Sequence, residues 1–117
     1  MVIQTYQLAS RQLLTQARTE LWEGDTRQAS EKGWGAAAQM VKAIAEQRGW
    51  EHKTHRQIWQ AVRRLNDENR EIALSVLFRS ANHLHSNFCE DLDAADDVGD
   101  ALNDVEQFID LLEPLIN

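Results

Sequence analysis

Hydrophobic residues recur along most of the chain at spacings of three and four positions, and strict alternation of apolar and polar residues is rare. This spacing places apolar side chains on one face of an α-helix. The segment "WEGD" interrupts the first such pattern, because Gly24 readily takes the left-handed conformation that closes a helix. The sequence therefore predicts a first helix that ends near Gly24 and packs through Tyr6, Leu13, Leu14, Ala17 and Leu21.

A second helix is predicted from Thr26 to Arg48. Asp25 is a favourable N-cap, Gln28 is expected to complete a capping box with it, and Gly49 stops the helix. The inner face of this helix is expected to carry Ser30, Trp34, Ala37, Met40, Val41 and Ile44.

The stretch "EKGWGAAAQM" in this second helix combines small residues with one large indole. Each glycine inside a helix costs roughly 1 kcal/mol relative to alanine. Gly33 and Gly35 therefore predict a tight helix contact that offsets this cost, with Trp34 filling the space that the small residues leave.

A short third helix is expected to begin after a Thr54 cap and to pack through Ile58, Trp59, Val62 and Leu65. The polar residues 66–69 end it, and a fourth helix is expected to turn inward the residues Ile72, Ala73, Val76, Leu77, Ser80 and Leu84. A polar break then precedes a last helix, whose seam is expected to contain Val98, Ala101, Leu102, Val105, Phe108, Ile109 and Leu112.

The loops between these helices are short, which favours contact between consecutive antiparallel helices. With 117 residues the chain is long enough for one core of moderate size. The predicted fold class is therefore all-α: an antiparallel up-and-down bundle of four long helices plus one short helix, forming a single domain over residues 1–117.

The composition, 43% hydrophobic and 26% charged, is that of an ordinary globular protein. Neither a basic segment followed by an apolar run nor a stretch of about 18 apolar residues occurs, so a cytoplasmic protein without a membrane partner is expected. Cys89 is the single cysteine, which excludes an intrachain disulfide and a cysteine-based metal site.

The net charge of −7 is distributed unevenly along the chain. Residues 1–47 are neutral, residues 48–79 carry +3, and residues 80–117 carry −10 without any lysine or arginine. Proteins that bind nucleic acid mainly through charge have a net basic surface. Any RNA contact is therefore expected to be local and to use the middle segment. The aspartates at the start of the last helix are interpreted as a solvated face that the helix dipole favours.

The four histidines do not have the spacing of a helical metal site. His52 and His55 lie at a loop–helix boundary, and His83 and His85 point in different directions on an ideal helix. We therefore expect no metal and no other cofactor. His55 is interpreted as a residue at a helix start that packs against the neighbouring helix.

Arg79 and His85, in the segment "RSANHLHSNF", are the strongest candidates for chemistry. An imidazole can take a proton from a ribose 2′-hydroxyl or give one to the leaving oxygen, because its pKa lies near neutrality. A guanidinium can hold a phosphate and stabilise the charge it gains in the transition state. On a straight helix Arg79 and His83 are about 40° apart, but Arg79 and His85 are about 120° apart. A shared site would need an unwound helix end or a second subunit. The alternative is that these residues form an exposed polar flank of a bundle helix.

Three segments together resemble the HEPN superfamily, and within it the archaeal branch of the PaREP type. They are "LLTQARTELWEGDTRQASEKGWGAAAQMVKAIAEQRG", "THRQIWQAVRRL" and "ANHLHSNFCE", and the resemblance covers about residues 8–90. The resemblance implies a bundle of four or five helices that forms a symmetric homodimer. It also implies a metal-independent endoribonuclease of toxin or defence type, often with a nucleotidyltransferase as antitoxin partner.

The catalytic motif of that family is an arginine followed after four to six residues by a histidine, which Arg79 and His85 match. Two positions depart from the family pattern: Ser80 follows the arginine where Asn, Asp or His is common, and Phe88 is the nearest aromatic residue after the histidine. The first functional hypothesis is RNA cleavage by Arg79 and His85. The residues expected to support it or to guide the RNA are Ser80, Asn82, His83, Arg56, Arg63 and Arg64.

The second hypothesis is a non-catalytic dimeric interaction module. Some HEPN proteins serve in binding or assembly, and the same dimer would then dock a nucleotidyltransferase or another protein, for example through the acidic last helix.

Overall fold

A computed structural model describes residues 2–91 and 93–116, and within these ranges the secondary structure is entirely helical. The elements are α1 (Val2–Trp22), α2 (Thr26–Arg48), α3 (His55–Glu68), α4 (Leu74–Glu90), α5 (Ala95–Leu112) and a 3₁₀ turn, η1 (Glu113–Leu115).

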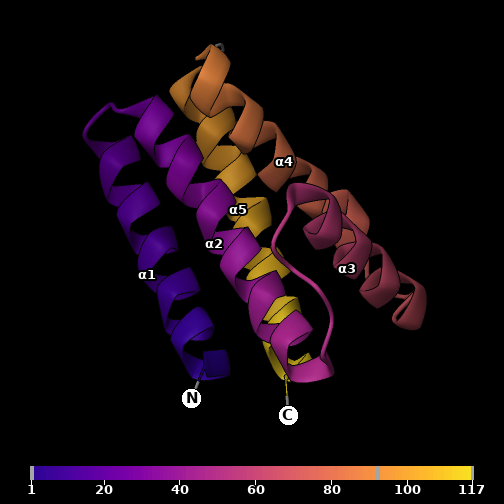
Figure 1. Cartoon of the computed structure of the whole chain (residues 1–117). Coiled ribbons are helices and arrows are strands. Elements are labelled where there is room, and N and C mark those ends of the chain that lie inside the picture. The colour runs from indigo at the N-terminus through magenta and orange to yellow at the C-terminus, as the bar shows by residue number, and fades with distance from the viewer. Residues whose placement is uncertain (1, 92, 117) are drawn as a thin grey trace.

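The four long helices α1, α2, α4 and α5 alternate in direction, and the short α3 lies beside α4 (Figure 1). Helix α2 packs against each of the other four helices, so it is the central element of the bundle. One hydrophobic core draws buried residues from all five helices. The predicted all-α bundle is thereby confirmed.

The predicted N-caps of α2 and α3 are present, but the capping box expected at Asp25 and Gln28 is only half formed, because the Gln28 side chain does not bond back to the Asp25 amide. The Asp25 side chain accepts a hydrogen bond from the Gln28 amide at 3.1 Å, and Gly49 ends α2 in the left-handed conformation with φ of 72°. At the start of α3, Thr54 and Gln57 form a reciprocal capping box. These local contacts explain why the bounds of α2 were readable from the sequence.

Helix α4 differs from its predicted inner face. It begins at Leu74, so Ala73 lies just before the helix, and the Val76 side chain is 58% exposed. Leu84 is buried as expected, but the face that points to the core is rotated and consists of Leu74, Phe78, Ala81 and Leu84. The reason is Phe78, whose large ring packs against Trp34, Trp59 and Phe108. The predicted seam of α5 is confirmed, since every residue of it is buried.

Gly33 allows α2 to approach α4 and α5 closely. A Cβ atom at this position would lie 2.6 Å from Leu102 Cδ2 and 2.8 Å from Leu84 Cδ1, both shorter than real carbon–carbon contacts. Leu84 and Leu102 are fully buried and therefore have little room to move. The tight contact predicted from the small residues of α2 is present at Gly33.

Replacing this glycine tests the contact. Gly33→Ala gains helix propensity of about 1 kcal/mol, but overpacking of a buried site typically costs about 1–3 kcal/mol. We expect net destabilisation in urea unfolding, with a larger loss for Gly33→Val. Gly99→Ala is the matched control: the nearest atom to its new Cβ is 3.5 Å away, so it should be neutral or stabilising. A Gly33→Ala variant at least as stable as Gly99→Ala would contradict the assigned contact.

Candidate functional site

His85 lies in a cluster of three aromatic rings formed by helices α2, α3 and α4. Its imidazole centroid is 4.8 Å from the Trp34 ring and 5.2 Å from the His55 ring. His55 in turn stacks on Trp34 at 4.8 Å with an interplanar angle of 17°. The three centroids form a nearly equilateral triangle, so the two imidazoles lie side by side and the indole does not separate them. We call Trp34, His55 and His85 the ring cluster.

His55 enters the ring cluster because it is the first residue of α3, directly after the Thr54 cap. Residues 49–54 run back beside α2 before α3 begins (Figure 1), which brings the start of α3 next to α4. The His55 Nε2 atom lies 2.9 Å from Asn82 Oδ1 of α4. The prediction that His55 packs against a neighbouring helix is confirmed. Asn82, predicted as a supporting residue, fixes its ring.

The surroundings of His85 favour its neutral form. Partial burial lowers the pKa of the His85 imidazole from its usual 6.5, and the positive charge that His55 carries when protonated lowers it further. The side chain nevertheless remains open to solvent on one side. Its ring nitrogens form no hydrogen bond with another residue in the described part of the chain. The surroundings of His85 thus favour a neutral imidazole, which could accept a proton from a bound molecule.

Arg79 lies on a different flank of α4. It lines a shallow hollow of about 320 Å³ together with Ser80, His83, Asp97, Asp100, Ala101 and Asp104. The Ser80 hydroxyl donates a hydrogen bond to Asp104 Oδ2 at 2.6 Å, and His83 Nε2 lies 2.6 Å from Asp93 Oδ2. Ser80 and His83 are thus occupied by carboxylates of α5 and the segment before it. One chain by itself does not bring Arg79 and His85 together.

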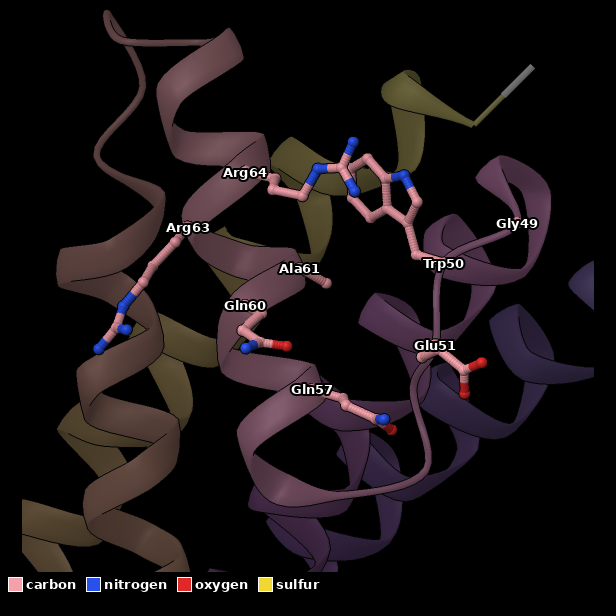
Figure 2. Close-up of a pocket in the computed structure, with 8 residues that line it drawn as sticks. All are labelled: Gly49, Trp50, Glu51, Gln57, Gln60, Ala61, Arg63 and Arg64. Atoms are coloured by element: carbon pink, nitrogen blue, oxygen red, sulfur yellow. The ribbon is translucent and has the colours of Figure 1, made fainter.

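The basic residues predicted to guide RNA are divided between two sides of α3. Arg64 lies over the Trp50 indole, 4.2 Å from the ring centroid, whereas Arg63 points away from this indole and toward α4 (Figure 2). Arg63 instead packs over Trp59 at 5.5 Å. Arg56 is exposed, directly follows His55 and precedes Arg63 by two helical turns, so Arg56 and Arg63 share one side of α3, about 80–100° around the helix from His55.

A larger hollow of about 590 Å³ lies between α3 and the loop that precedes it. Figure 2 shows the residues that line it: Gly49, Trp50, Glu51, Gln57, Gln60, Ala61, Arg63 and Arg64. Polar groups in this hollow already have partners within the chain: Gln57 Oε1 accepts hydrogen bonds from the Lys53 and Thr54 amides. Arg64 is held by Trp50 in the same hollow. This hollow supports the α2–α3 connection, and we place no catalytic group in it.

Within residues 2–91 and 93–116, no three His, Cys, Asp or Glu side chains are close enough together to form a metal site. None of the helices in these ranges has the length and hydropathy needed to cross a membrane.

The pKa of His85 can be measured directly by following its C2 proton in NMR spectra as a function of pH. Partial burial and the charge of protonated His55 both disfavour the His85 imidazolium. We therefore expect the midpoint of the His85 titration to lie below pH 6.5. Removing the neighbouring charge in His55→Gln should raise the midpoint partway, since burial remains the larger cause. His52→Gln is the control, because His52 packs against Tyr6 and Glu46 instead. A His85 midpoint at or above 6.5 in the wild type would contradict the arrangement.

The fold and part of the sequence are shared with known proteins. The structure is similar to the crystal structure of a protein from Sulfolobus solfataricus, with a TM-score of 0.81 over 93% of this chain and 97% of that one. The two sequences are 22% identical, so the similarity establishes the fold. No curated protein matches the chain. The model of the archaeal PaREP1/PaREP8 family matches residues 5–109, and the chain therefore belongs to this family.

Proposed function

We propose that the protein is a metal-independent endoribonuclease of HEPN type that acts on single-stranded RNA as a homodimer. The resemblance of residues 8–90 to HEPN proteins and the helical bundle are in keeping with this function. The observation that carries the proposal is His85, a surface imidazole with free nitrogen atoms, kept neutral and placed next to a second imidazole.

The chemistry needs only a proton acceptor, a proton donor and a group that binds the phosphate. A neutral imidazole takes the proton of the ribose 2′-hydroxyl, and the resulting oxygen attacks the adjacent phosphorus. The bond from phosphorus to the 5′-oxygen breaks, and that oxygen receives a proton. The products are a 2′,3′-cyclic phosphate and a 5′-hydroxyl. His85 is the proton-transfer group, and Arg79 is the phosphate-binding group in this proposal.

A second copy of the chain would bring Arg79 into the same active site as His85. The two side chains are about 120° apart on one helix, and the carboxylates of Asp97, Asp100 and Asp104 line the same hollow as Arg79. These charges would repel a phosphate inside the hollow, so in this proposal Arg79 binds the phosphate outside it, toward a second copy. In a twofold dimer, Arg79 of one copy can face His85 of the other, as each copy contributes both groups.

RNA is guided toward His85 by Arg56 and Arg63 in this proposal, because both lie on the side of α3 next to the one that carries His55. They provide a local basic surface on a chain whose net charge is −7. Electrostatic attraction of this kind is sensitive to salt. Arg64 is engaged with Trp50 on the other side, so we assign it no contact with the RNA.

The test is cleavage of single-stranded RNA in the presence of a chelator, with products identified by mass spectrometry. We expect cyclic phosphate ends from the wild type. Loss of a proton-transfer group typically costs about 10²–10⁴-fold, so His85→Gln should be impaired to that degree. Arg79→Ala should lose about 10²–10³-fold, as for other groups that stabilise charge in a transition state.

Matched controls are available for both substitutions. His52→Gln removes a histidine that packs on α1 and α2, and Arg70→Ala removes an exposed arginine from the turn before α4. Both should cleave RNA at the wild-type rate. Cleavage that persists in folded His85→Gln and Arg79→Ala proteins would exclude the proposed active site.

The second candidate function is a docking module for a nucleotidyltransferase or another protein. The hollow that combines Arg79, Ser80 and His83 with three aspartates of α5 favours it, because this surface is polar and carries both signs of charge. Intact RNA after incubation with the wild type, together with a stoichiometric complex with a nucleotidyltransferase encoded beside the protein, would support this function over cleavage.

A further inference from the structure

His55 and His85 have the arrangement of a donor and acceptor pair. Their ring centroids are 5.2 Å apart and the interplanar angle is 32°. They come from different helices, α3 and α4, so this proximity is a product of tertiary packing. Both side chains remain exposed, and both are backed by the partly buried Trp34 indole. A substrate on the surface can therefore reach both rings at once.

We propose that His55 is a second catalytic residue, the general acid that protonates the leaving 5′-oxygen, while His85 is the general base. This assignment rests on the proposed function and extends it to a residue outside the arginine–histidine motif. The resemblance to HEPN proteins gives no role to His55.

Two observations determine which imidazole holds the proton. The His55 Nε2 atom lies 2.9 Å from Asn82 Oδ1, and an amide oxygen can only accept a hydrogen bond. Nε2 of His55 therefore carries a hydrogen, and its Nδ1 atom remains for exchange with the substrate. Two imidazolium charges this close repel each other, so protonation of one ring disfavours protonation of the other. Because the surroundings of His85 disfavour its charged form, we assign the base to His85 and the acid to His55.

The reaction is balanced by the pair alone. His85 takes the proton from the 2′-hydroxyl, the 2′-oxygen bonds to phosphorus, the bond from phosphorus to the 5′-oxygen breaks, and His55 gives its proton to that oxygen. The pair ends with the proton on His85 and a neutral His55. Exchange with water returns the proton to His55 before the next turnover, and no further reactant is needed.

A substrate with sulfur in place of the bridging 5′-oxygen separates the two roles. A thiolate leaves without being protonated, so the general acid becomes unnecessary for this substrate, whereas the base is still required. On ordinary RNA, His55→Gln should be slower than the wild type by about 100-fold or more. On the sulfur-bridged RNA it should come within about tenfold of the wild type, and His85→Gln should remain impaired on both substrates.

His55→Phe is the control for an effect on folding. Phenylalanine keeps an aromatic ring against Trp34 but cannot carry a proton. It should behave as His55→Gln does on each substrate, with an unchanged helical circular dichroism spectrum. Equal impairment of both His55 variants on the two substrates would overturn the assignment of His55 as the acid, as would full activity on ordinary RNA. Full activity of His85→Gln, or intact RNA with the wild type, would instead overturn the proposed function itself.

Discussion

The close contact of α2 with α4 and α5 at Gly33 is the constraint on which the candidate site depends. Gly33 contributes no side chain to this contact, and the Leu84 and Leu102 side chains occupy the space that a Cβ atom would need. The next residue, Trp34, is thereby held at the edge of the core with its indole turned toward α3 and α4. The indole supports both imidazoles, so the packing of the core determines the position of His55 and His85.

The charged side chains are also divided between two regions of the molecule. The carboxylates of α5 bind the arginines of α1, as Arg18 with Glu106 and Arg11 with Asp110 show, and they also line the hollow at Arg79. Arg56 and Arg63 share a side of α3 next to the one that carries His55. The aspartates of α5 line the flank of α4 that carries Arg79, and under the proposed function the arginines of α3 would provide the local basic surface for RNA.

The sequence predicted the helices well, because local signals define their ends: Asp25 and Gly49 for α2, and Thr54 for α3. It predicted the inner face of α4 less well, since the contacts of Phe78 with three rings of other helices rotate that face. It singled out His85, but it did not assign His55 to the site. Positions 55 and 85 are far apart in the chain, and only the return of residues 49–54 beside α2 brings them together. The histidine directly after the Thr54 cap was the one available signal, and it indicated packing.

The most direct test of this account is a nuclear Overhauser experiment on the protein in solution. If Trp34 holds the two imidazoles side by side, ring protons of His55 should show cross-peaks to those of His85, and both should show cross-peaks to the indole. Well-resolved histidine resonances without these cross-peaks would mean that the rings do not meet. In that case the packing of α2 would not position a pair of reactive groups, and the account of the site would be wrong.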